Sequence, residues 1–194
     1  MKDRKMLKDL KKFKEIINDI KKVAEDVYLE LGPGFEETDY QAAMHIEFSR
    51  MKKFEALREV SIELFYKDQY LKFGELDFLI TPKKGSKGYP LPFLIETKVT
   101  NTEPADTYDQ VRRYLMSCPK NSSSMINQIE IGALIVFTKS SKIEKGEVIE
   151  KDSDGSTITR EPSSPSMPKL NLYVSCYFYD KETKTVKPIL DLFK

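Results

Sequence analysis

Apolar residues near the start of the chain recur with the period of an α-helix. Their positions alternate steps of four and three residues over residues 6–31, and they are Met6, Leu10, Phe13, Ile17, Ile20, Ala24, Val27 and Leu31. Lysines crowd the opposite face, a pattern typical of an amphipathic helix that lies on a protein core. The alternative is a coiled-coil seam, and hence a homodimer through this helix, because about three heptads is the lower limit for that interpretation.

Turn residues end this helix and introduce the elements that follow. The segment Gly32-Pro33-Gly34 stops the helix, since proline disfavours helix in the residue before it and glycine tolerates left-handed backbone. We expect a second helix from about Phe35 to about Phe54. Apolar runs then predict strands over 57–66, 70–80, 92–99, 129–138 and 170–179. A further helix is expected over about 104–116, with Pro104 in its first turn.

Length and composition favour a single domain. The chain has 194 residues, of which 40% are hydrophobic and 32% charged, enough for one buried core. We divide it into an N-terminal helix (1–31), a core (32–138), a flexible insertion (139–169) and a C-terminal strand and tail (170–194). The insertion is rich in Lys, Ser, Glu and Pro, which favours a mobile loop or a loose hairpin.

Charge, cysteines and hydropathy limit the setting of the protein. The formal net charge is +1, so any surface that binds nucleic acid must be locally basic. No run of about 18 apolar residues is present, and no membrane span is expected. The first residues do not resemble a secretory signal. Cys118 and Cys176 lack metal-site spacing, which indicates free thiols in a reducing intracellular compartment, with cytoplasm and nucleus not distinguished.

Acidic residues and a lysine gather on two neighbouring predicted strands. Glu96 and Lys98 are two residues apart and so share one face, and Asp77 can join them if the strands pair as a hairpin. Glu75 should share the face of Asp77. Two carboxylates and a lysine can hold a hard divalent cation beside a water, which is the chemistry of metal-dependent phosphodiester hydrolysis. A surface ion pair is the alternative for Glu96 and Lys98.

Two further segments strengthen this interpretation. The segment Leu31-Gly32-Pro33-Gly34-Phe35-Glu36-Glu37-Thr38-Asp39-Tyr40 resembles the signature of the GxxExxY proteins. The segment Gln110-Val111-Arg112-Arg113-Tyr114 resembles a Gln-x-x-x-Tyr helix motif of an exonuclease-like branch. With the acidic strands, residues 15–138 resemble the PD-(D/E)XK nuclease superfamily. The resemblance implies an α/β, restriction-endonuclease-like core: a central mixed β-sheet flanked by helices, here with an N-terminal helical extension.

The resemblance also implies roles for individual residues. The metal ligands would be Asp77, Glu96, Glu37 and the backbone carbonyl of Thr97, whose side chain should face away from the site. Lys98 would orient or activate the attacking water and stabilise charge at the phosphate, and Gln110 would support the site. For Glu37, an acid placed in a first helical turn only by the helix dipole is the alternative.

Contacts with nucleic acid would come from tyrosines and basic residues. The candidates are Tyr40, Tyr114, Lys83, Lys84, Lys87, Arg112 and Arg113. For the tyrosines a packing role is the alternative, and for the basic residues a solvated surface.

The implied function is that of a nuclease that uses Mg²⁺, with Mn²⁺ as a substitute, to hydrolyse DNA in repair, recombination or replication. Whether the DNA is single- or double-stranded stays open. The alternative is a catalytically silent module that binds nucleic acid within a larger assembly.

Overall fold

The computed structural model describes residues 2–83, 89–100, 108–138, 148–151, 157–160 and 172–189, with side chains for 11–83, 89–100, 108–137 and 172–189. Its helices are α1 (Lys2–Leu31), α2 (Glu37–Ser49) and α3 (Tyr108–Ser117), with short 3₁₀ turns at Cys118–Lys120 and Ile126–Gln128. Its strands are β1 (Phe54–Tyr66), β2 (Gln69–Pro82), β3 (Phe93–Thr100), β4 (Ile131–Thr138), β5 (Val148–Lys151), β6 (Thr157–Arg160), β7 (Leu172–Asp180) and β8 (Thr185–Pro188).

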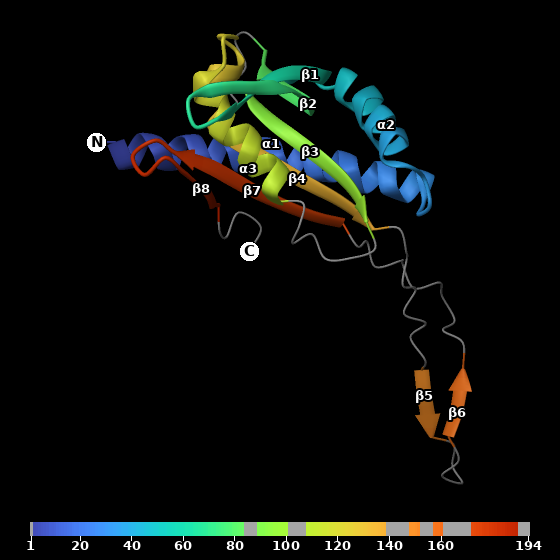
Figure 1. Ribbon diagram of the computed structural model, residues 1–194. Helices are drawn as coiled ribbons and strands as arrows, with labels where there is room; N and C mark the ends of the chain where they lie inside the picture. The colour runs from blue at the N-terminus through green and yellow to red at the C-terminus, as the bar shows by residue number, and fades with distance from the viewer. Residues whose placement is uncertain are drawn as a thin grey trace.

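Six strands form one mixed sheet in the order β1-β2-β3-β4-β7-β8. β3 and β4 are parallel, and the other neighbours are antiparallel. Parallel neighbours need a crossover connection, and α3 lies in it; Pro104, expected in its first turn, is outside the described residues. Figure 1 shows α1 and α3 on opposite faces of the sheet. The expected α/β fold, a mixed sheet flanked by helices, is confirmed.

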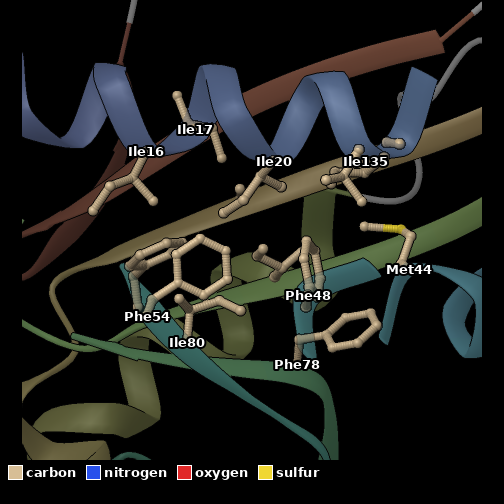
Figure 2. Close-up of a cluster of buried hydrophobic side chains, with 14 of the residues drawn as sticks. Ile16, Ile17, Ile20, Met44, Phe48, Phe54, Phe78, Ile80 and Ile135 are labelled. Atoms are coloured by element: carbon tan, nitrogen blue, oxygen red, sulfur yellow. The ribbon is translucent and has the colours of Figure 1, made fainter. Parts of the chain in front are cut away.

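The apolar stripe of α1 packs against the chain's own sheet. Its buried side chains share a cluster, here called the α1-side cluster, with apolar residues of α2, β1, β2 and β4 (Figure 2). They are Phe13, Ile16, Ile17, Ile20, Val23, Ala24, Val27 and Tyr28. The amphipathic-helix interpretation is therefore confirmed for residues 11–31, where the stripe is covered by the chain's own core, and the homodimer stays a prediction. None of the described helices combines the length and the hydrophobicity needed to cross a bilayer.

α3 packs on the other face through a second cluster, here called the α3-side cluster. Val111 and Leu115 are fully buried there, together with Leu94 of β3. Gly132 of β4 permits this close approach, because a Cβ at that position would lie 2.9 Å from Leu94 Cδ1 and 3.0 Å from Val111 Cγ1. The sheet is thus held from both faces, and β3 is fixed along its length.

The second helix is shorter than the sequence indicated. α2 ends at Ser49, and Phe54, expected to close the helix, instead begins β1. Phe54 pairs with Pro82 across the β1–β2 ladder, and its ring packs against Phe48 of α2 with centroids 5.6 Å apart. A strand and a helix can both bury this phenylalanine, so its apolar character did not show where α2 ends and β1 begins.

Residues after β4 add structure that the sequence indicated only in part. Within 139–169, the described residues form the antiparallel pair β5–β6, a sheet separate from the main one. β8 pairs with β7 at the edge of the main sheet, where only a tail was expected. Its four residues bury a single apolar side chain, Val186, so the pattern is too short to predict a strand.

The two cysteines are free and buried, as expected. Burial raises the pKa of the Cys118 thiol to about 12 and also raises the pKa of Cys176. Both therefore behave as small apolar side chains and not as nucleophiles.

Replacing Ile17 by alanine should lower the free energy of unfolding by about 2–5 kcal/mol, because this fully buried side chain would leave a cavity. Leu29→Ala on the same helix is the control. Leu29 is 54% exposed, and its loss should cost about 0.5 kcal/mol or less. Urea denaturation at several protein concentrations measures both variants. A loss for Leu29→Ala as large as that for Ile17→Ala would contradict this packing, because it would show that the exposed face of α1 is also buried in solution.

Candidate functional site

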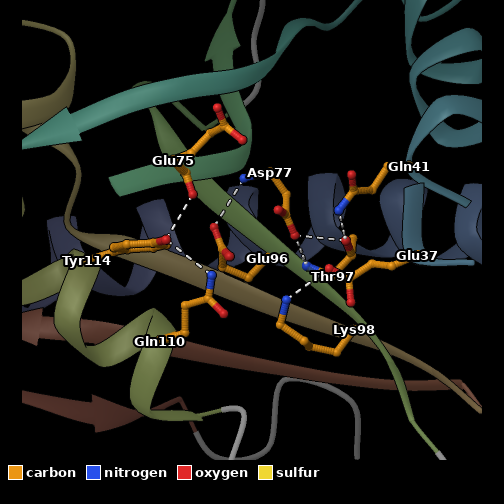
Figure 3. A network of polar contacts seen from close by, with 9 residues as sticks. All are labelled: Glu37, Gln41, Glu75, Asp77, Glu96, Thr97, Lys98, Gln110 and Tyr114. Carbon is orange, nitrogen blue, oxygen red and sulfur yellow. Dashed lines mark hydrogen bonds and ion pairs between the residues drawn. The ribbon is translucent and has the colours of Figure 1, made fainter. Parts of the chain in front are cut away.

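The candidate site forms where β2 and β3 separate. Backbone pairing between these strands ends at Phe78 and Ile95, and the next pair in the same register is Asp77 and Glu96. At this pair the Asp77 N–H donates to Glu96 Oε1 at 3.2 Å, and the Thr97 N–H donates to Asp77 Oδ2 at 2.7 Å (Figure 3). Each carboxylate thus bonds to the backbone of the other strand and takes the place of a ladder hydrogen bond.

Asp77 lies where β2 changes the face on which its side chains pack. Leu76 belongs to the α3-side cluster, whereas Phe78 belongs to the α1-side cluster. In a regular strand, residues two apart share a face. Across the β1–β2 pair, Glu59 lies opposite Asp77 with a φ of 54°, a left-handed conformation that costs a non-glycine residue about 1–2 kcal/mol. Such strain is frequent beside functional groups.

Glu96 lies on the α3-facing side of β3 and shares that face with Lys98, as predicted. Glu96 is fully buried, and its Oε2 atom has no hydrogen-bond partner among the described residues. Burial, followed by the charge of Asp77, raises the pKa of Glu96 to about 9, although the Asp77 N–H and Lys98 offset part of the rise. Without a cation, the Glu96 carboxyl is therefore neutral near pH 7.

Lys98 pairs with Glu37 from the first turn of α2, with 2.9 Å between Nζ and Oε1. Burial by itself lowers the pKa of Lys98. The hydrogen bond and charge of Glu37, with the charges of Asp77 and Glu96, outweigh this effect and raise the pKa. Lys98 is therefore an ammonium at neutral pH, which can stabilise negative charge but cannot accept a proton.

The turn before α2 sets the position from which Glu37 reaches Lys98. Gly32 and Gly34 have φ values of 73° and 105°, in the left-handed region that favours glycine. The Tyr40 hydroxyl donates to the Gly32 carbonyl at 2.6 Å and so closes the turn onto the helix.

Tyr40 has a packing role. It is fully buried, and its ring stacks on Phe137 of β4 with centroids 4.4 Å apart. These contacts favour the packing alternative for Tyr40, and a contact with nucleic acid stays a prediction. The spacing from Gly34 through Glu37 to Tyr40 instead anchors α2 to the sheet.

Hydrogen bonds link Gln110 and Tyr114 of α3 to the backbone of β2. Gln110 Nε2 donates to the Tyr114 hydroxyl at 3.1 Å, and that hydroxyl donates to the Glu75 backbone carbonyl at 2.9 Å. Tyr114 is buried, so the packing alternative is again favoured, and a contact with nucleic acid stays a prediction. The Glu75 side chain is exposed and points away from the Asp77 carboxylate in Figure 3, contrary to expectation. The change of face at Asp77 explains that difference.

The Thr97 side chain turns toward Asp77, although the sequence indicated that it faces away from the site. Its hydroxyl donates to Asp77 Oδ2 at 2.8 Å and accepts a hydrogen bond from Gln41 Nε2 at 2.8 Å. Asp77 departs from strand alternation and so comes within reach of the Thr97 face of β3. Gln41 was not predicted. Its place four residues after Glu37, on the same helix face, is the signal that could have found it.

The basic residues expected to bind nucleic acid lie at the surface where they are described. Arg112 and Arg113 are exposed on α3. Lys83, after the end of β2, is exposed and donates to the Met51 carbonyl at 3.0 Å. Lys84 and Lys87 lie outside the described residues. A role for these residues in binding nucleic acid stays a prediction.

Comparison with protein families agrees with the geometry. The model of the PD-(D/E)XK nuclease superfamily matches residues 14–147, a range that holds Glu37, Asp77, Glu96 and Lys98 and covers more than half of the chain. Searches of curated proteins and of solved structures gave no significant match. The chain belongs to the PD-(D/E)XK nuclease superfamily.

Proposed function

We propose that this protein is a divalent-metal-dependent nuclease that hydrolyses phosphodiester bonds in DNA, with a role in repair, recombination or replication. The observation that carries the proposal is Glu96 Oε2, a buried carboxyl oxygen without a partner among the described residues, beside Asp77 and near Lys98. An unsatisfied buried polar group costs about 1–3 kcal/mol and calls for an explanation. A cation between the two carboxylates would explain it, and superfamily membership supports nuclease chemistry.

The available oxygens suit Mg²⁺, with Mn²⁺ as a substitute. Among the described residues, no three His, Cys or carboxylate side chains are close enough to enclose a metal ion. Mg²⁺ does not need such a cage, because it is usually held by one or two carboxylates with waters and substrate phosphates. Asp77 would bind through Oδ1, since both described hydrogen bonds to this carboxylate end on Oδ2. Glu96 would bind through Oε2, and the Thr97 carbonyl remains a third candidate ligand.

Glu37 fits better as the partner of Lys98 than as a metal ligand. Its Oε1 atom accepts a hydrogen bond from Lys98, and among the described residues Glu37 does not lie close enough to Asp77 and Glu96 to complete a group of three ligands. The pair holds the Lys98 ammonium on the face of β3 that carries Glu96. From there Lys98 would bind a phosphate oxygen and stabilise the negative charge that develops on it. When bound, the divalent cation would act as a Lewis acid on the phosphate and activate water.

The same geometry supports the narrower kinship with GxxExxY proteins and with the Gln-x-x-x-Tyr branch. The motif residues Glu37, Tyr40, Gln110 and Tyr114 each make a structural contact. Tyr40 closes the glycine turn, Glu37 pairs with Lys98, and Gln110 is joined to Tyr114.

Without a divalent cation, the free energy of unfolding should fall as pH rises from about 4.5 to about 9. The folded state keeps the Glu96 proton up to its raised pKa of about 9, whereas the unfolded chain releases it near 4.5, so deprotonation favours unfolding between these values. The contribution of this one group is up to about 1.4 kcal/mol per pH unit. Glu96→Gln should remove this part of the slope and stabilise the metal-free protein near pH 8.

Urea denaturation in a chelator at pH 5, 6.5 and 8 measures this slope. Glu55→Gln is the control, because Glu55 is an exposed carboxylate on β1 and its loss should leave the wild-type slope in place. Added Mg²⁺ should stabilise wild type and Glu55→Gln by mass action, and Glu96→Gln much less. A Glu96→Gln variant with the wild-type slope would show that Glu96 is not the titrating group.

Replacing Lys98 by methionine should reduce Mg²⁺-dependent cleavage of DNA by about 10²–10³-fold, the usual effect of losing one group that stabilises transition-state charge. Methionine keeps most of the aliphatic stem. The lost ion pair is partly exposed and contributes about 1 kcal/mol or less, so the fold should be retained.

Lys181→Met is the matched control. Lys181 pairs with Glu130 at 2.5 Å after β7, outside the site, and its loss should leave cleavage unchanged. Labelled single- and double-stranded DNA, each with Mg²⁺, Mn²⁺ or chelator, gives the rates. Wild-type protein that binds DNA but cleaves neither form with either metal would instead support a catalytically silent binding module.

A further inference from the structure

A chain of hydrogen bonds crosses three elements and ends on Asp77. Gln41 of α2 donates through Nε2 to Thr97 Oγ1 of β3 at 2.8 Å, and Thr97 Oγ1 lies 2.8 Å from Asp77 Oδ2 of β2. The Thr97 N–H donates to the same oxygen at 2.7 Å. Gln41 and Thr97 are both buried, with 6% and 0% of their surface exposed, so water does not compete for these bonds. Figure 3 shows the three side chains converging at the split between the strands.

The chemistry of the three groups fixes the direction of the chain. The Gln41 amide nitrogen can only donate, and Asp77 Oδ2 already accepts from the Thr97 N–H. The Thr97 hydroxyl has one proton, and because Gln41 occupies its acceptor side, that proton is directed to Asp77. The Thr97 side chain therefore cannot change its χ1 rotamer without breaking the hydrogen bond that the buried Gln41 amide donates to Oγ1.

We propose that Gln41 and Thr97 are positioning residues that hold the Asp77 carboxylate with Oδ2 turned to β3 and Oδ1 free to bind a divalent cation. The inference rests on the proposed metal site, and it adds a pair of residues whose effect on the metal passes through Asp77. Neighbours that orient a ligand commonly control metal affinity in this way.

The same helix serves both sides of the site. Gln41 lies one helical turn after Glu37, which holds Lys98. α2 thus orients the acid on β2 through Gln41 and the ammonium on β3 through Glu37. A small movement of α2 would therefore disturb both side-chain contacts. The glycine turn and the Tyr40 hydrogen bond fix the first turn of α2.

The test measures the affinity of the full chain for Mn²⁺ by isothermal titration in the absence of DNA. Thr97→Val removes the hydroxyl at nearly constant shape, and Gln41→Leu removes its donor. Each should weaken Mn²⁺ binding by about 10–100-fold, the usual loss when such a neighbour is removed. Thr97→Ser keeps the hydroxyl and should bind Mn²⁺ as tightly as wild type. Thr81→Val, elsewhere on β2, is the control for the substitution itself and should also match wild type.

A double-mutant cycle without metal tests the chain of hydrogen bonds separately. If Gln41 acts through Thr97, either single substitution already breaks the hydrogen bond between them. The double variant Gln41→Leu/Thr97→Val should therefore lose measurably less unfolding free energy than the sum of the losses in the two single variants. Strict additivity would overturn the relay. Coupled stability with unchanged Mn²⁺ affinity would overturn the positioning role and leave a structural bond.

Asp77→Asn separates a failure of this inference from a failure of the proposed function. If wild type binds Mn²⁺ and Asp77→Asn does not, the ion is at this site, and the Thr97 and Gln41 variants decide the inference alone. If wild type and Asp77→Asn bind Mn²⁺ equally or not at all, the proposed metal site is wrong and the positioning role fails with it.

Discussion

The separation of β2 and β3 at Asp77 and Glu96 is the constraint on which the rest of the site depends. Buried backbone groups need partners, and at this point the two strands no longer supply them to each other. The two carboxylates supply the missing acceptors: Glu96 accepts a hydrogen bond from the Asp77 N–H, and Asp77 accepts one from the Thr97 N–H. Two acids are therefore placed side by side by the same bonds that end the ladder. α1 and α3 pack on the two faces of the sheet that contains this opening.

The electrostatics of the site follow from that placement. Ionising two adjacent buried carboxyls costs free energy, because their charges repel each other and burial removes their hydration. The more deeply buried one, Glu96, therefore has a raised pKa and keeps its proton. Lys98 lies on the same face and pairs with Glu37, so it remains an ammonium. Its positive charge offsets the negative charge of the acids only in part. The arrangement costs stability in the metal-free protein, and the proposed cation would remove that cost. Such a conflict between stability and function is common at active sites.

The sequence predicted the parts of the structure that follow a simple period. The stripe of α1, the shared face of Glu96 and Lys98 and the one-turn spacing of Gln110 and Tyr114 all appear as expected. Each depends on geometry inside one regular element. The boundary at Phe54 failed because an apolar ring is buried equally well in either element.

The side chains that were misplaced lie around one irregularity. Glu75 and Thr97 were assigned to faces by strict alternation, and alternation stops at Asp77, opposite the left-handed Glu59. No residue type in β1 or β2 marks that change, since a glycine would be the usual signal for positive φ and a glutamate stands there instead. Gln41 was missed for a related reason. Its spacing from Glu37 placed it on the helix face of the site, but its partner Thr97 lies 56 residues away in the sequence, and the spacing does not show that contact.

The most direct test of the account is the anomalous scattering of Mn²⁺ in a crystal of the wild-type protein. We expect one peak between Asp77 Oδ1 and Glu96 Oε2, at bonding distance from both, with Asp77 Oδ2 still bonded to Thr97 and Lys98 still paired with Glu37. A peak on Glu37 with Lys98 displaced would contradict the assignment of these two residues. No peak at the Asp77–Glu96 pair, with Mn²⁺ at saturating concentration, would contradict the central claim that the opening between β2 and β3 is a cation site.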